Sequence, residues 1–313
     1  MNLSELEATN QKTLADIREG RADSGRPDLF PFYGFYEADI FECPSFVLFT
    51  ANDCPRALNI VFDKNFEMMS MRLWCRLARN ATGILDIGAH VGVYSLAAAA
   101  LRKDITIHAF EPNPHAYSRL RMHKIINTFE NIADHPCAVG DKNAYVPFSW
   151  TVKWVSQISS GGSVGERPGG KAETVATQQI KLDDTKIPSK LGARGLIKID
   201  VEGGEVSVFE GMPDVLALKP DIILETFSQK SCDFINARIL PLGYKVYKIF
   251  EDEKRIEPRD RLTPCVPSAE INFNQFLSIL PESEVEALYR DWETTPSIVT
   301  GKQIGRASCR ERV

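Results

Sequence analysis

The stretch Ile84–Ser95, Ile-Leu-Asp-Ile-Gly-Ala-His-Val-Gly-Val-Tyr-Ser, joins an apolar run to an acid and two glycines. The apolar residues are typical of a buried strand, Gly88 and Gly92 predict a tight turn, and the run Val93–Leu101 predicts a helix. Glycine has no Cβ, so a ligand can approach the backbone closely there. The unpaired N–H groups at the helix start attract electron-rich groups. The stretch therefore predicts a strand–turn–helix unit that binds a ligand against its backbone.

The spacing of the glycines narrows the kind of ligand. Dinucleotide sites place glycines at positions one, three and six of their motif. Here Asp86, Gly88 and Gly92 take positions one, three and seven, with an acid in the first place. This arrangement departs from the dinucleotide pattern and matches the D-x-G-A-x-x-G type of S-adenosylmethionine-dependent methyltransferases. An acid beside the turn suits the cationic amino end of that cofactor. An ordinary strand–loop–helix unit and a nicotinamide-nucleotide oxidoreductase are the alternatives.

Composition limits the class of protein. The chain has 313 residues, of which 43% are hydrophobic and 25% charged, the balance of a globular protein with one large or two small domains. The net charge of −5 gives no broad attraction for nucleic acid. The seven cysteines are scattered without a Cys-x-x-Cys pair, which argues against a zinc or redox site and suits a reducing compartment. Met1–Gly20 has no apolar core, and no apolar run reaches the ~18 residues of a membrane span. We expect a cytoplasmic protein.

Residues 1–80 are expected to cap one end of a sheet. Apolar spacing predicts helices over Leu3–Arg18 and Asn65–Ala78, and Phe46–Thr50 is a candidate strand. Phe30–Phe41 is rich in aromatic residues, which we interpret as packing.

After the glycine turn, apolar strand patterns alternate with helical ones. The predicted strands are Ile105–Phe110, Asp134–Val139, Leu196–Val201 and Pro220–Thr226, with later ones at Gly243–Ile249 and Ile271–Leu280. Such alternation predicts an α/β fold with a doubly wound, mostly parallel sheet. Ligands of these sheets lie outside the carboxyl ends of the strands, where Asp86, Glu111, Asp200 and Glu225 all fall.

Glu111 follows Asp86 by 25 residues, at the end of the second strand. A carboxylate there can accept protons from both hydroxyls of a ribose. The loop Gly140-Asp141, after the third strand, is expected to lie against the adenine ring. The predicted cofactor-binding residues are Asp86, Gly88, Ala89, Gly92, Glu111, Pro112, Asn113, Val139 and Asp141.

Two further strands are predicted at Tyr145–Trp150 and Thr174–Leu182, with the glycine- and serine-rich segment Ser156–Lys171 between them. That segment is either a mobile surface loop or a lid over the substrate, with Trp150 and Trp154 at its base.

These residues together resemble the FkbM-type family of S-adenosylmethionine-dependent methyltransferases. The matching pieces, in order, are Leu85–Gly92, Phe110-Glu111-Pro112-Asn113-Pro114, Leu182-Asp183-Asp184 and Ile197-Lys198-Ile199-Asp200-Val201-Glu202-Gly203-Gly204-Glu205. His90 stands where the family often has Asn. The resemblance covers about residues 84–227. It implies a seven-stranded sheet with a final antiparallel strand near Ile271–Leu280, and methyl transfer, usually to oxygen, on a sugar or natural product.

A hydroxyl acceptor needs its proton removed, which is a task for a general base. Asp200 is the first candidate for this base, although it could equally position the cofactor; Glu225, His90 and His135 are the lesser ones. Asp200, Glu202 and His90 are expected to face the acceptor, a small molecule or glycan. Asp200 and Glu225 offer hard oxygen ligands, but no further cluster accompanies them, so no metal is predicted. N-methylation and an inert cofactor-binding module stay open.

The predicted methyltransferase domain covers residues 81–290, followed by a disordered tail over 291–313. Its last part, Ile304–Val313, resembles the translation of a sequencing-library adapter and is excluded from the fold interpretation.

Overall fold

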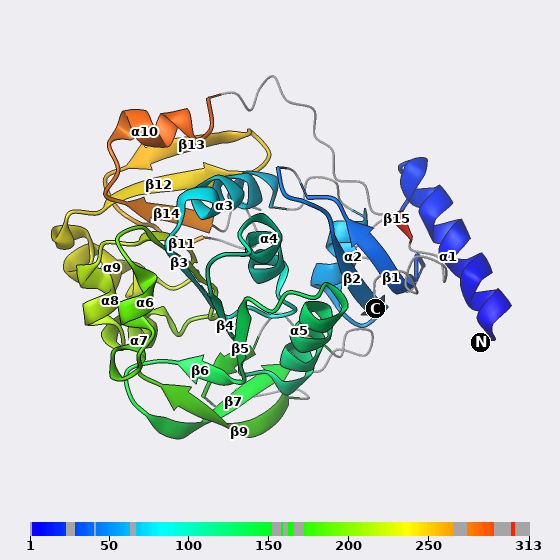
Figure 1. Cartoon of the computed structure of the whole chain (residues 1–313), viewed down its shortest axis with the longest axis horizontal. Helices are drawn as coiled ribbons and strands as arrows, with labels where there is room; N and C mark the ends of the chain where they lie inside the picture. Colours follow the sequence, from blue (N-terminus) through cyan, green and yellow to red (C-terminus); the bar gives the residue numbers. More distant parts are fainter. Residues whose placement is uncertain are drawn as a thin grey trace.

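The computed structural model describes residues 2–22, 29–40, 42–62, 67–151, 158, 162–165, 172–265, 274–290 and 302–303. Its centre is an eight-stranded sheet in the order β13-β12-β14-β11-β10-β3-β4-β5 (Figure 1). The strands are β3 Gly83–Ile87, β4 Ile107–Phe110, β5 Ile132–His135, β10 Gly195–Ile199, β11 Asp221–Glu225, β12 Lys245–Phe250, β13 Arg255–Arg259 and β14 Asn274–Ser278. The pairs among β3, β4, β5, β10 and β11 are all parallel.

The predicted doubly wound, mostly parallel sheet is confirmed. β14 runs antiparallel to both β11 and β12, as expected for the strand near Ile271–Leu280. The sheet has one strand more than the predicted seven, because β13 pairs with β12 as an antiparallel edge strand.

Alternate residues of the central strands enter two separate cores, as the two-sided burial of a parallel sheet requires. Ile84 packs in one core with Trp74 of α3 (Met68–Asn80) and Leu96 of α4 (Val93–Leu101). Leu85 lies in the other core with Val208 of α7 (Glu205–Glu210). The second core also receives α6 Pro188–Leu191, α8 Pro213–Ala217 and α9 Gln229–Arg238.

The predicted third strand, Asp134–Val139, is divided in the structure. Pro136 separates β5 from β6 (Cys137–Val139), since proline lacks the N–H that a strand interior needs. β6 belongs to a second, four-stranded sheet in the order β6-β9-β7-β8. Its other strands are β7 Ala144–Thr151, β8 Gly162–Val164 and β9 Ala172–Ile180. This sheet lies beside the carboxyl ends of β4 and β5 (Figure 1).

The N-terminal region forms α1 Leu3–Arg18, β1 Tyr33–Ala38, β2 Phe46–Ala51 and α2 Pro55–Phe62. β2 is fixed to α5 (Pro114–Ile126) because the N–H of Val47 donates to Asn127 at 2.7 Å and that of Phe49 donates to His123 at 2.9 Å. Within the predicted disordered tail, Lys302–Gln303 instead form β15, which pairs antiparallel with β1. Residues 291–301 and 304–313 lie outside the described residues.

The N-terminal region also connects to the far edge of the main sheet through a buried carboxylate. Glu251, just after β12, accepts the N–H groups of Met69 and Ser70 at 2.6 and 3.2 Å and the Ser70 hydroxyl at 2.5 Å. These bonds satisfy the first N–H groups of α3, which its N-cap residue Glu67 leaves without a side-chain cap. Burial raises the pKa of Glu251 to about 7.

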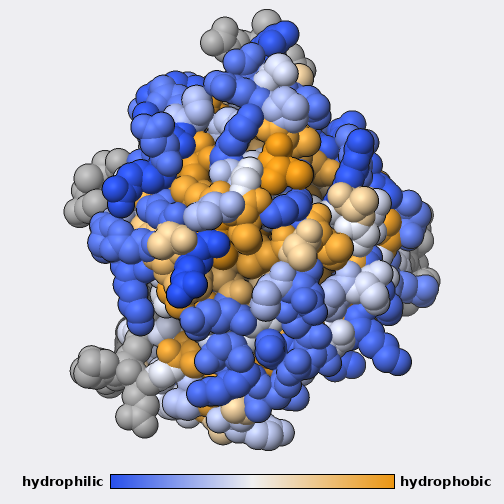
Figure 2. All heavy atoms as spheres, turned by 90° about the vertical axis from the view of Figure 1, so that its left-hand side faces the viewer, coloured by the Kyte–Doolittle hydropathy of each residue, from blue (hydrophilic) through white to orange (hydrophobic). Residues whose placement is uncertain are grey.

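The side of the molecule that carries α7, α8 and α9 shows apolar side chains gathered in a hollow rimmed by polar ones (Figure 2). A groove on these helices is lined by Leu216, Phe234, Ile239 and Leu242. Within the described ranges, every helix is too short or too polar to cross a bilayer. The remaining short elements are η1 Leu182–Asp184, η2 Leu240–Leu242 and α10 Glu282–Ala287.

Candidate active site

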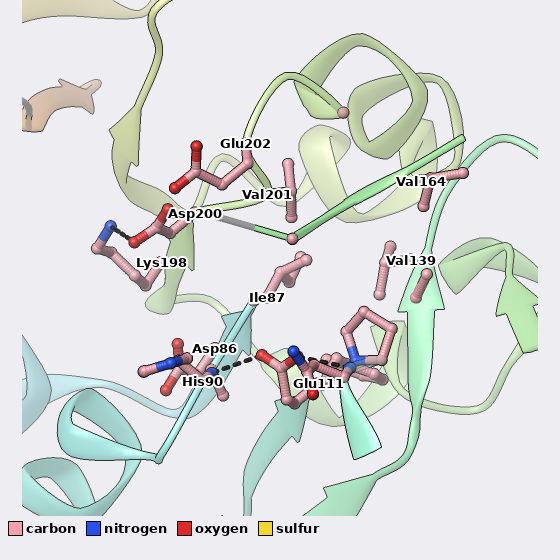
Figure 3. Close-up of a pocket in the computed structure, with 18 of the residues that line it drawn as sticks. Asp86, Ile87, His90, Glu111, Val139, Val164, Lys198, Asp200, Val201 and Glu202 are labelled. Carbon is pink, nitrogen blue, oxygen red and sulfur yellow. Dashed lines mark hydrogen bonds and ion pairs between the residues drawn. The ribbon is translucent and has the colours of Figure 1, made fainter. Parts of the chain in front are cut away.

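A cavity of about 280 Å³ lies at the carboxyl ends of β3, β4 and β10, with walls from β6, β8 and the first turns of α4 and α7 (Figure 3). This is the edge of the sheet at which the sequence places the site. Ten predicted residues line it: Asp86, Gly88, Ala89, His90, Glu111, Pro112, Asn113, Val139, Asp200 and Glu202. Gly92, Asp141 and Glu225 do not.

The turn at Gly88 holds three strand ends together. The N–H groups of Gly88 and Ala89 donate to the carbonyl of Phe110 at 3.0 and 2.9 Å, and the N–H of Asp200 donates to that of Ile87 at 2.9 Å. Gly88 has a φ of +83°, and a Cβ built on it would stand 1.8 Å from the Asp200 carbonyl oxygen. Only glycine can occupy this position, because the β10 backbone fills the space where a side chain would begin.

Glu111 is buried and faces the cavity with both oxygens already anchored. Oε2 accepts the N–H of His90 and Oε1 that of Asn113, each at 2.7 Å. A carboxylate has about four acceptor positions, so capacity remains for two further hydroxyl donors. Burial raises the pKa of Glu111 to about 7, although the two N–H bonds oppose the shift. The site thus holds a carboxyl whose pKa lies near neutral pH. Hydrogen-bond donors from a ligand would lower that pKa and favour the ionised carboxylate.

Asn113 provides a second polar group that points to a ligand. Its Oδ1 caps α5 by accepting the N–H groups of His115 and Ala116 at 3.0 and 3.4 Å. Its Nδ2 is buried and, within the described part of the chain, has no hydrogen-bond partner. A buried donor without a partner is costly, and this one belongs to a residue of the cavity wall. A nucleoside fits both residues, because its ribose hydroxyls can donate to Glu111 and a ring or ribose oxygen or nitrogen can accept from Nδ2 of Asn113.

Asp86 uses part of its carboxylate inside the protein. Its Oδ2 accepts the N–H and the hydroxyl of Ser95, in α4, at 3.0 and 2.6 Å. Burial raises the pKa of Asp86 to about 6, while the Ser95 bonds and the charge of Lys198 lower it. Oδ2 of Asp86 therefore fixes α4 to β3, a structural role that its sequence motif did not indicate. Asp86 also lines the cavity.

The loop Gly140-Asp141, predicted to lie against the adenine ring, directly follows the cavity residue Val139. Asp141 is exposed and lies off the cavity, where it accepts the Ser207 hydroxyl at 2.9 Å and Nε2 of Gln179 at 3.0 Å. Gln179, on β9, lines the cavity near Val139 instead. No local pattern marks Gln179, because only the pairing of β6 with β9 brings it to this wall.

Acidic groups gather at the other end of the cavity. Oxygens of Asp200, Glu202 and Glu225 lie within 4.8 Å of one another. Glu225 is buried and, unlike the other two, is not part of the cavity wall. The structure thus adds a third carboxylate to the pair identified in the sequence, and the three form the group of hard oxygen ligands that could hold a cation.

Two residues that the sequence analysis did not single out complete this end. The hydroxyl of Tyr94, on the first turn of α4, donates to Glu67 at 2.6 Å, and both line the cavity. Of the two histidines considered as bases, His90 lines the cavity, whereas His135 stacks on Phe110 with ring centres 4.6 Å apart and is not part of the cavity wall.

Glu205, the last acid of the family-like motif, supports the loop after β10. Its two oxygens accept the N–H of Gly203 at 2.8 Å and the hydroxyl of Ser231 at 2.6 Å. It thereby fixes the loop that carries Glu202 to α9.

Most of the predicted lid, with Trp154, lies outside the described residues. Its described part includes β8, which pairs with β7. Gly162 and Val164 of β8 line the cavity, and Trp150 is buried.

A sheet in which β14 lies antiparallel between β11 and β12, with a glycine turn after β3 and an acid after β4, defines an α/β methyltransferase of the S-adenosylmethionine-dependent class. The family model described as Methyltransferase FkbM domain matches residues 86–246, and the chain belongs to that family. It is a methyltransferase whose cofactor is S-adenosylmethionine.

Two curated relatives are similar to part of the chain. "Methyltransferase 1" of Beauveria bassiana is 24% identical over 172 residues, which cover 50% of this chain and 69% of the relative. "31-O-demethyl-FK506 methyltransferase FkbM" of Streptomyces tacrolimicus is 26% identical over 155 residues, which cover 42% of this chain and 59% of the relative. Among solved structures, a precorrin-6y C5,15-methyltransferase from Geobacter metallireducens aligns with a TM-score of 0.36 and 18% identity, over 67% of this chain and 86% of that one.

Proposed function

We propose that the protein methylates a hydroxyl oxygen of a sugar or natural product, with Asp200 as the general base. The observation that carries this proposal is the place of the Asp200 carboxylate, which is 23% exposed and lies on the wall of the cavity that also contains Glu111 and Asn113. The relative named for a 31-O-demethyl compound favours oxygen as the methylated atom. We propose residues 81–290 as the methyltransferase domain.

When bound, S-adenosylmethionine would supply a methyl group from its sulfonium, and the rest of the cofactor would be the leaving group, a neutral thioether. The side chains of this protein bind and align. Glu111 and Asn113 hold the nucleoside, the Gly88 turn allows its close approach, and Asp86 attracts the cationic amino end. Asp200 accepts the proton that the hydroxyl loses as its oxygen gains the methyl group. Alignment and exclusion of water supply much of the rate.

If Glu111 accepts the ribose hydroxyls, cofactor binding should be linked to pH. The pKa of this carboxyl is 4.5 in the unfolded chain and about 7 in the folded protein without ligand. The stability that protonation of Glu111 contributes is therefore fully present below pH 4.5 and is lost as the pH rises through about 7. Hydroxyl donors favour the ionised form, so binding should release a proton and become tighter as pH rises toward about 7.

Calorimetry with S-adenosylhomocysteine, in buffers of different ionisation enthalpy, measures this proton release. Glu111→Gln should bind more weakly and lose the release near the Glu111 pKa, while Asp86 leaves a smaller release nearer its own pKa of about 6. An affinity that stays constant from below to above both pKa values would contradict the role of Glu111.

A screen with isotopically labelled S-adenosylmethionine over sugars and small hydroxyl and amine compounds tests the reaction itself. We expect label in an O-methyl product. Label on nitrogen would replace the proposal with N-methylation. Tight binding of the cofactor without label in any compound would favour an inert binding module.

A further inference from the structure

Lys198 is a buried lysine in the middle of the sheet. It precedes Ile199 at the end of β10, and its side chain is 2% exposed. The parallel pairing places it beside Asp86 on β3 and Ile223 on β11. Burying an ammonium is expensive unless charges and hydrogen bonds compensate it, so its partners indicate what the position is for.

The compensation inside the protein is incomplete. Nζ lies 3.8 Å from Oδ2 of Asp200, which is an ion pair but longer than a hydrogen bond, and 5.2 Å from the centre of the Tyr94 ring. Within the described residues, Nζ donates no hydrogen bond. An ammonium has three donors, so an acceptor atom from outside the chain would satisfy what the fold leaves open.

The ammonium is directed toward the acceptor end of the cavity. Lys198 is part of the cavity wall, and its head group points at Asp200, next to Glu202 (Figure 3). Against the attraction of the three carboxylates for a cation, the Lys198 ammonium itself repels a cationic amine placed in contact with it. It suits an oxygen that becomes negative as its proton departs.

Building on the proposed function, we infer that Nζ of Lys198 binds the acceptor oxygen and stabilises its developing negative charge, while Asp200 takes the proton. The O–H bond breaks, its electron pair stays on the oxygen, and the proton forms the new bond to Asp200. Lys198 is thus a catalytic residue that favours acidic or readily polarised hydroxyls over amines.

A phenol whose ionisation is visible tests this role without methyl transfer. 4-Nitrophenol is titrated by its phenolate absorbance in the presence of saturating S-adenosylhomocysteine. In Lys198→Met the bound phenol should ionise at least about one pH unit higher than in the wild type, a tenfold loss of preference for the phenolate. Lys198→Arg should keep most of that preference because it retains the charge. If Lys198→Met does not fold, Lys198→Gln is measured in its place.

Lys248→Met is the matched control. Lys248 is also a buried strand lysine, with Nζ 5.4 Å from the centre of the Phe250 ring, but it lies outside the cavity wall. It should titrate the probe as the wild type does.

Three results would overturn the inference: no change in the spectrum of 4-nitrophenol with the wild type, equal ionisation in wild type and Lys198→Met, or a Mg²⁺-induced return of the variant to the wild-type value. The last would assign the positive charge to a cation on the carboxylates. Failure here is distinct from failure of the proposed function, since a nitrogen acceptor in the labelling screen would refute O-methylation and leave the binding of the phenolate by Lys198 measurable.

Discussion

Asp200→Asn should lower the turnover of a hydroxyl acceptor by about 10²–10⁴-fold, because the amide keeps the shape of the side chain but cannot accept a proton. The affinity for S-adenosylhomocysteine should be unchanged, since Glu111, Asn113 and the Gly88 turn are intact. Lys198 loses its ion-pair partner at 3.8 Å, so the remaining activity should depend on the acidity of the acceptor. More acidic hydroxyls need less help to ionise and should lose less.

The measurement compares single-turnover rates on the acceptor found by labelling with affinities from calorimetry. Asp252→Asn, an exposed carboxylate in the turn after β12, is the control and should behave as the wild type. Loss of cofactor binding together with turnover would make Asp200 a cofactor-positioning residue. Unchanged turnover would remove it from the proton transfer and direct attention to His90 or Glu225.

Gly88→Ala should destabilise the fold by at least about 3 kcal/mol, through left-handed backbone strain and overpacking together. The φ of +83° is unfavourable for alanine, and its Cβ would stand 1.8 Å from the Asp200 carbonyl oxygen. That contact is with backbone, so no side chain can rotate away. The ends of β3 and β10 would have to separate, which should also abolish cofactor binding.

Gly243→Ala separates the two causes. Gly243 has a φ of +99°, but among the described residues no atom of another segment lies within 4 Å of a Cβ built on it, so only the strain of about 1–2 kcal/mol applies. Urea unfolding midpoints of the two variants measure the difference. Equal midpoints would show that the β3 turn relaxes freely and that the close contact does not hold the site together.

The sequence predicted most reliably what local pattern determines. The helix Val93–Leu101 has the predicted bounds. Asp86 is the penultimate residue of β3, and Glu111 and Asp200 directly follow β4 and β10, strands whose apolar runs are unmistakable. These positions require no knowledge of distant pairing, because the carboxyl ends of parallel strands meet at one edge.

What the sequence did not predict depends on contacts between distant segments. Gln179 reaches the cavity because β9 pairs with β6, and Tyr94 meets Glu67 from 27 residues away. Asp141 stays a predicted cofactor residue, and its hydrogen bonds with Ser207 and Gln179 on the surface could not be read from its own loop. Glu225 ends its strand as predicted, yet it is buried and is not part of the cavity wall.

The position of β14 has a consequence for the nascent chain. β12 and β13 precede β14 in the sequence, but β14 lies between β12 and β11 in the sheet. While the polypeptide is being synthesised, the β12–β13 hairpin can form. It cannot yet join the sheet, because the position between β12 and β11 belongs to β14, which has not been made. Until residues 274–278 have left the ribosome, β11 presents an open edge that invites wrong pairing. The sheet can therefore close only after β14 has been made, and truncation before β14 should yield aggregation rather than a smaller enzyme.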